Sequence, residues 1–180
     1  LNGLLGTVLI GTAVATFFTG SEFSVNKMNL VNLTGNAMPV ISEWKGPAHG
    51  LEAALNVQNL LLGLTVFFLA RTLALLYFMN LVDHAAVSGR IRKQLLYNAL
   101  PFLVFFLAFT AWLLLSKGFA VDPVTKWVSM EPYKYLHNLI GMPVVAILFL
   151  AGVAGVLVGL YKPLLCFEKA GNKGIWFAGI

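Results

Sequence analysis

Four long runs without a charged side chain constrain this 180-residue sequence more than any other feature. No Asp, Glu, Lys, Arg or His occurs in residues 1–21, 53–70, 94–116 or 138–161. A helix needs about 20 consecutive, mostly apolar residues to cross the hydrocarbon core of a bilayer. A small soluble core has no room to bury four such helices, so the runs predict an all-α integral membrane bundle with four transmembrane helices.

The composition agrees with lipid as the solvent of this chain. Charged residues make up 11% of it and hydrophobic residues 59%, whereas about a quarter of an average soluble domain is charged. The formal net charge of +5 would raise nucleic acid as a partner of a soluble protein. Here the basic residues lie between the apolar runs, where they set orientation in the membrane instead. The sequence therefore predicts the lipid bilayer, and no nucleic acid, as a partner.

The pattern of basic residues predicts how the chain is oriented. The spans are expected at about 1–19, 58–82, 95–116 and 138–161. A short loop, 83–93, and the tail that follows the fourth span are rich in Lys and Arg, whereas the longer loops 20–52 and 117–137 are nearly balanced in charge. Because Lys and Arg favour the cytoplasmic side, both ends of the sequence are predicted to be cytoplasmic.

The two ends and the cysteine content bear on the organisation of the chain. The sequence has no initiator Met, and residues 174–180 resemble the start of another apolar segment. We therefore expect one transmembrane domain over residues 1–180 that is incomplete at both ends. Cys166 is the only cysteine, which excludes an internal disulfide and a cysteine-based metal cage within this sequence.

Two of the expected spans carry small residues at helical spacing. In the first span the stripe consists of Thr7, Gly11, Ala15 and Thr19. In the fourth span it consists of Ala151, Gly155 and Gly159. Small residues let membrane helices approach closely, so each stripe predicts a site of helix packing.

Arg71 is the most unusual residue, because it falls at the centre of the second span. An Arg at mid-membrane costs at least about 2.5–3.5 kcal/mol on insertion scales and normally faces protein or water. The residues three and four positions away offer no partner for its charge: Phe67, Phe68, Ala74 and Leu75. A partner is therefore expected from another helix, a bound headgroup or a part of the protein missing from this sequence. In the alternative, the span shifts to 53–70 and Arg71 is a cytoplasmic flank.

The segment WKGPAHGLE at 44–52 brings aromatic, cationic, imidazole and carboxylate groups to the outer end of the second span. His49 and Glu52 are therefore candidate contacts for a proton exit or a lipid headgroup. The alternative is a capped helix start, where a carboxylate is favourable. His49 and His137 lie at similar expected depths, as bis-His haem ligation requires, yet both adjoin loops. We predict no catalytic, cofactor-binding or metal residues in this chain.

Five segments, read in order, resemble subunit II of cytochrome bd quinol oxidase in the form found in the Bacteroides group. The segments are IGTAVATFFTG at 10–20, NVQNLLLG at 56–63, FLARTLALLY at 68–77, RKQLLYNALPF at 92–102 and MEPYKYLHN at 130–138. None is a catalytic signature, so the resemblance rests on their order along the whole chain.

The resemblance implies a function as part of a complex. The family is an oxygen-reducing quinol oxidase of the respiratory chain in the bacterial inner membrane. Subunit I carries the haems b and d and takes quinol from the membrane pool. Subunit II binds no haem, supports assembly and access of protons and oxygen, and is compatible with a structural quinone. This chain would be an internal fragment of subunit II.

Two other functions stay open at this point. Half of a secondary transporter would place its site at broken helices near the membrane midplane. Pro101 and the glycines of the fourth span would support it, although Pro101 is expected near a helix start. The third reading is a purely structural membrane subunit.

Overall fold

Four membrane-length helices form the body of the protein in a computed structural model that describes residues 1–25, 42–82 and 84–165. They are α1 (Asn2–Thr19), α3 (Val57–Leu81), α4 (Ala85–Leu115) and α6 (Pro143–Leu165). Each has the length and apolarity needed to cross a membrane. The predicted all-α membrane bundle is confirmed for these residues.

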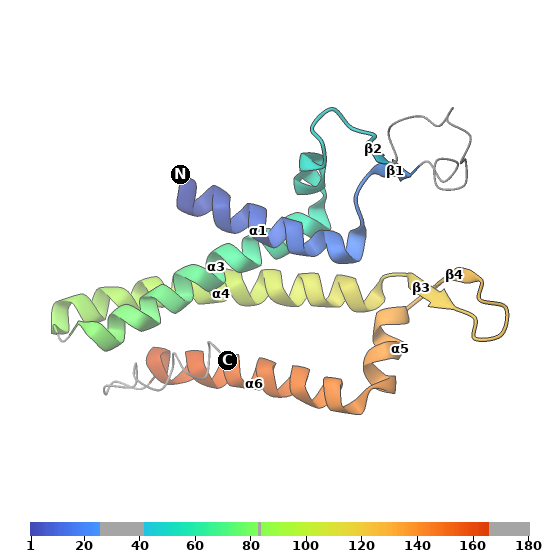
Figure 1. The fold of residues 1–180 in the computed structure, drawn as a ribbon. Helices are drawn as coiled ribbons and strands as arrows, with labels where there is room; N and C mark the ends of the chain where they lie inside the picture. Colours follow the sequence, from blue (N-terminus) through green and yellow to red (C-terminus); the bar gives the residue numbers. More distant parts are fainter. Residues whose placement is uncertain (26–41, 83, 166–180) are drawn as a thin grey trace.

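The helices run alternately in opposite directions, and both connections that carry strands lie at the same end (Figure 1). Strands β1 (Phe23–Val25) and β2 (Ser42–Trp44) pair antiparallel beyond α1, and β3 (Gly118–Val121) pairs with β4 (Val128–Glu131) beyond α4. These short hairpins were not predicted for the loops 20–52 and 117–137. In these loops the antiparallel pairing lets backbone N–H and C=O groups of the two segments hydrogen-bond to each other instead of to water.

The start of α4 corrects the predicted boundary of the third span. The helix begins at Ala85, so the loop expected at 83–93 is helical for most of its length. Ile91 and Leu95 lie one turn apart and are both buried. The Arg and Lys residues around them are compatible with a helix, because both have high helix propensity. The charge pattern marked the end of the apolar run, but the helix continues beyond it.

The fourth span also begins later than predicted. The short helix α5 (Lys134–Gly141) ends before Met142, and α6 starts at Pro143 in a different direction (Figure 1). A proline disfavours helical backbone in the residue before it and is well tolerated at the first position of a helix. Met142 accordingly has φ −117° and ψ 78°. The expected start at 138 therefore falls within α5.

Pro101 lies in the middle of α4, not near its start as predicted. The helix continues through it from Ala85 to Leu115. Since proline lacks an N–H, one backbone hydrogen bond of the ladder is missing at this point. Ala99, two residues before it, and Phe102, directly after it, are buried in the core, whereas Leu100 is exposed.

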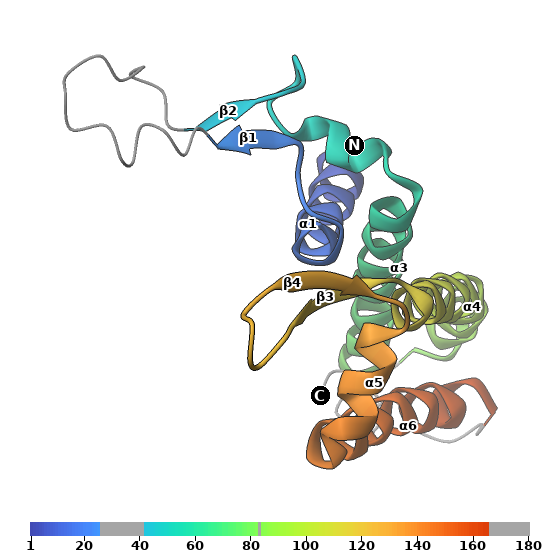
Figure 2. The same ribbon diagram turned by 90° about the vertical axis from the view of Figure 1, so that its right-hand side faces the viewer.

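The helices pack in sequence order, as the end-on view shows (Figure 2). α1 lies against α3, and α3 lies against α4 along most of its length. The main core joins α3, α4 and the C-terminal half of α6; its buried members are Leu76, Leu95, Ala99, Phe102 and Leu160. The N-terminal half of α6 stands away from α3 and α4, which leaves an open space in the membrane-spanning region.

Candidate functional site

Arg71 lies well inside α3, which continues for ten residues beyond it. The helix covers most of the predicted span 58–82, whereas residues 51–55, at the start of the alternative span 53–70, belong largely to a separate 3-10 helix, η1 (Leu51–Leu55). Asn56 caps α3 by accepting a hydrogen bond from the Gln58 N–H at 2.9 Å. The guanidinium is thus placed at a level of the helix that lipid or protein must surround.

The surroundings of Arg71 differ in part from the prediction. Its guanidinium carbon lies 5.5 Å from the ring centroid of Phe67, one turn earlier on the same helix. The prediction that no neighbour on its own helix interacts with it is wrong, because the face of an aromatic ring attracts a cation. In the part of the chain that the structure describes, Arg71 has no hydrogen bond or ion pair, and its side chain is exposed. None of the residues that the structure describes supplies a counter-charge to it.

Glu52 organises the turn that leads into η1. Its carboxylate accepts hydrogen bonds from the backbone N–H groups of Ala48 at 2.7 Å and Gly50 at 2.9 Å. A hydrogen bond from its own backbone N–H contributes most, followed by those from Ala48 and Gly50, and together they hold the pKa of Glu52 below its ordinary value of 4.5; the nearby His49 adds to the effect. A Cβ added at Gly46 would collide with this carboxylate. Glu52 is therefore built into the turn.

His49 is exposed at the tip of the same turn. Its φ is 51°, in the left-handed region that few residues other than glycine adopt. Next to it, Gly50 has φ 98°. The ring of Trp44 packs directly on Gly50, because a Cβ added there would lie 2.9 Å from Trp44 Cζ3. The structure thus brings His49 and Glu52 together, as the sequence suggested, but in a compact turn of hydrogen bonds. Arg71 is not part of this turn, because it lies on α3.

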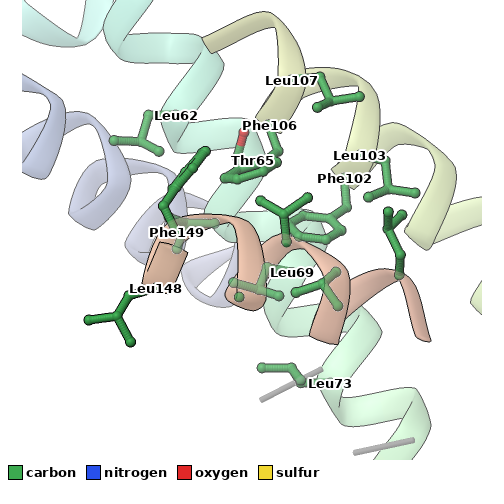
Figure 3. A pocket seen from close by; sticks show the side chains of 15 residues that line it. Leu62, Thr65, Leu69, Leu73, Phe102, Leu103, Phe106, Leu107, Leu148 and Phe149 are labelled. Carbon is green, nitrogen blue, oxygen red and sulfur yellow. The ribbon is translucent and has the colours of Figure 1, made fainter. Parts of the chain in front are cut away.

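An apolar cavity of about 550 Å³ lies between α3, α4 and the N-terminal half of α6 (Figure 3). Leucine and phenylalanine side chains form most of its lining, including Leu69, Phe102, Phe106 and Phe149. The hydroxyl of Thr65, the one polar side chain of the lining, donates to Leu61 O at 2.8 Å on its own helix. The cavity suits an acyl or isoprenoid chain. Its lining offers no side-chain N–H donor to the carbonyl oxygens of a quinone ring.

Sequence reasoning missed one polar contact that joins two helices. The Thr19 hydroxyl donates to Asn59 Oδ1 at 2.8 Å, and Asn59 Nδ2 donates to Ala53 O at 2.9 Å. Asn59 is almost completely buried. A polar side chain three residues after a helix cap and directly before a run of leucines was the signal that could have found it, because buried amides in membranes hydrogen-bond to neighbouring helices.

The histidines do not gather with other metal-ligating side chains. Among the residues that the structure describes, no group of three or more His, Cys, Asp and Glu could hold a metal ion. His49 lies in the turn before η1, His84 immediately precedes α4, and His137 lies on α5; all three are exposed.

Comparison of the sequence with known protein families gives no match, and comparison with curated proteins gives none either. The geometry described above is therefore what supports a function for this chain.

Proposed function

We propose that this chain is the haem-free subunit II of a cytochrome bd-type quinol oxidase, where it supports assembly of the haem-bearing subunit I and access of protons and oxygen to it. The observation that carries the proposal is the position of the resembling segments in the fold. Four of the five segments lie on α1, α3 and α4 and form contacts between these helices, and the fifth, at 130–138, runs from β4 into α5. Electron transfer and oxygen reduction are assigned to subunit I of the complex.

The segment at 10–20 and the segment at 56–63 meet where α1 crosses α3. Gly11 and Gly63 face each other there, and Thr19 bonds to Asn59. The segments at 68–77 and 92–102 supply most of the buried core between α3 and α4, including Leu76 and Leu95. Residues that carry the resemblance are thus residues that hold the bundle together, which fits a subunit with a structural role.

The transporter alternative depends on broken helices near the membrane midplane. In the described residues α3 and α4 are continuous over their full lengths, and α4 continues through Pro101. The break at Met142 lies at the end of α6 that is adjacent to the β3–β4 hairpin. Pro101 therefore does not break α4, so it does not supply the broken helix that the transporter alternative needs.

The proposal includes the bacterial inner membrane and cytoplasmic ends. Supporting it, Arg90, Arg92 and Lys93 lie on the first turns of α4, at the end of the bundle opposite both hairpins (Figure 1). In a background with Cys166→Ser, Ser88→Cys should be protected from an impermeant thiol reagent added outside the cell. Val124→Cys, on the exposed β3–β4 turn, should be labelled. The reverse pattern would invert the topology.

Co-purification tests the function itself. The full-length protein, tagged and extracted from its own membranes in mild detergent, should bring with it a chain that gives the visible spectrum of haems b and d. The preparation should consume oxygen when quinol is added. A preparation that contains this chain at high yield, with neither haem nor quinol oxidation, would refute the proposal and favour the structural membrane subunit.

A further inference from the structure

One face of α3 has the spacing of a helix–helix seam. Its residues recur at alternating intervals of four and three: Leu60, Leu64, Phe67, Arg71, Ala74, Phe78 and Leu81. Side chains at this spacing lie along one side of a helix and form the contact surface of packed helix pairs. We call these seven residues the Arg71 face.

The Arg71 face is not the surface through which α3 contacts the rest of the chain. α1 packs on Gly63 and Asn59, and Thr72 and Leu76 are buried on the side of α4. The cavity is lined by Leu62, Leu69 and Leu73, and Leu69 and Leu73 also pack against the core around Leu76, away from the Arg71 face.

The C-terminal half of the Arg71 face is open. Arg71 and Ala74 are exposed, Phe78 is 49% exposed and Leu81 is 66% exposed. Exposure of apolar side chains in a membrane helix is normal, because lipid covers them. Exposure of Arg71 is not, since a guanidinium in hydrocarbon requires a partner. It lies ten residues before the end of α3, which is about 15 Å of helix rise and more than the few ångströms gained by snorkelling.

The counter-charge cannot come from the four spans of this chain or from the same spans of a second copy. All seven acidic residues lie outside them in the sequence, at positions 22, 43, 52, 83, 122, 131 and 168. A copy of this chain seated on the Arg71 face would therefore bring apolar side chains to the guanidinium. A carboxylate at the level of Arg71 therefore has to come from outside these four spans.

We infer that the Arg71 face is the docking surface for a transmembrane helix of a different protein chain, one that carries an Asp or Glu at mid-membrane depth. The carboxylate pairs with the guanidinium through charge-assisted hydrogen bonds, which an Arg can make with two N–H groups at once. Ala74, one turn beyond Arg71, leaves room for the incoming backbone. The inference does not need the partner to bind haem.

Photocrosslinking in native membranes tests the inference on the full-length protein. Ala74→benzoylphenylalanine places the reactive group on the Arg71 face. Leu150→benzoylphenylalanine is the matched control, because Leu150 is exposed on α6. We expect Ala74 to give an adduct with another chain, and the linked peptide to contain an Asp or Glu within an apolar run. Leu150 should give at least tenfold less of that adduct.

Charge reversal then tests the ion pair. Arg71→Glu should reduce the adduct at least tenfold, and Arg71→Lys should reduce it less. Changing the linked Asp or Glu to Arg in the partner should restore the adduct of the Arg71→Glu variant. Arg90→Leu, an exposed cation on α4, should leave the yield unchanged. If Arg71→Glu does not accumulate in the membrane, Arg71→Gln replaces it, and it should also reduce the yield of the adduct at least tenfold.

Several results would overturn the inference: adducts only with lipid, adducts with a second copy or another part of the same polypeptide, a linked peptide without an acidic residue, or an adduct indifferent to Arg71→Glu. These results are distinct from failure of the proposed function. A carboxylate-bearing partner without haem would reject the oxidase and keep the inference. Co-purified haem with no carboxylate at Arg71 would reject the inference and keep the oxidase.

Discussion

The α1–α3 contact and the α6 helix use similar sequences with opposite results. At the α1–α3 contact a Cβ added to Gly11 would lie 2.6 Å from Gly63 Cα, so the two backbones touch. On α6 a Cβ added to Gly152 meets nothing within 4 Å. Both helices are apolar enough to span a membrane and both carry several small residues. Gly11 is a point of close backbone contact between helices, whereas Gly152 is not.

The difference shows that a glycine permits close approach without causing it. At the α1–α3 contact a second glycine faces the first, and the bond from Thr19 to Asn59 joins the helices near the end of α1. Opposite the N-terminal half of α6 stand bulky side chains, among them Phe102 and Phe106. With no hydrophobic drive between helices in lipid, contact depends on complementary shape, and here a cavity remains instead.

The largest effect is expected where α6 does close on its neighbours. Leu76 is completely buried in the core that includes Leu160 of α6. Leu76→Ala should lower the free energy of unfolding by about 2–3 kcal/mol, because the cavity it creates is enclosed. Leu157→Ala, at the half-exposed lining of the existing cavity, should cost less than about 1 kcal/mol, since lipid fills the space. SDS-induced unfolding in mild detergent measures both; equal losses would mean that α6 packs uniformly.

A smaller loss is expected from the same change in the two compared glycines. Gly11→Ala should lower the free energy of unfolding by about 1–2 kcal/mol, because the new methyl group meets backbone atoms of α3 that have no free rotamer to escape it. Gly152→Ala should change it by less than about 0.5 kcal/mol. The same unfolding titration provides the values. If Gly11→Ala is also neutral, Gly11 is not required for close packing of α1 on α3, and the contrast with Gly152 is wrong.

The polar contribution to the α1–α3 contact should be smaller again. Thr19→Val removes the interhelical hydrogen bond to Asn59, and such bonds in membranes average about 0.6 kcal/mol. Thr65→Val removes a hydrogen bond within α3 only and should be close to neutral. A double-mutant cycle of Thr19→Val with Asn59→Ala isolates the pairwise energy. Coupling of zero would show that Asn59 is held by Ala53 alone.

The smallest effect is expected at the turn outside the bundle, and it depends on pH. Because the pKa of Glu52 is lowered in the folded turn, its stabilising effect is present above its ordinary value of 4.5 and is lost as pH falls through the lower folded value. Trp44 packs on Gly50 in this turn. With the other tryptophans changed to Phe, acid should alter Trp44 fluorescence below pH 4.5, and Glu52→Gln should remove that step. Glu43→Gln, on the exposed strand β2, should leave it in place.

Some of the candidate site was predictable, and the reason is local. The depth of Arg71 follows from the length of the apolar run around it, and the grouping of His49 with Glu52 follows from their separation by three residues. The ring of Phe67 beneath Arg71 was within reach of sequence reasoning, because positions four apart share a helix face. It was missed since only a counter-charge was considered as a partner.

Other features could not be predicted, because they depend on contacts between distant segments. The bond between Thr19 and Asn59 joins residues forty positions apart. The strands β3 and β4 pair around a turn in which the Asp122 carboxylate accepts the N–H groups of Val124 and Thr125. These bonds, Val124 first, also hold the pKa of Asp122 below its ordinary value.

By itself the sequence determined that this is a membrane protein with four spans and one Arg within them, because span length and apolarity are properties of single segments. Only the tertiary structure decided that Gly11 meets Gly63, that Gly152 faces open space and that no described residue covers the C-terminal half of the Arg71 face. Each of these depends on which side of a helix a neighbour occupies. In lipid that choice is made by shape and by a few polar contacts between helices, neither of which can be read from one segment alone.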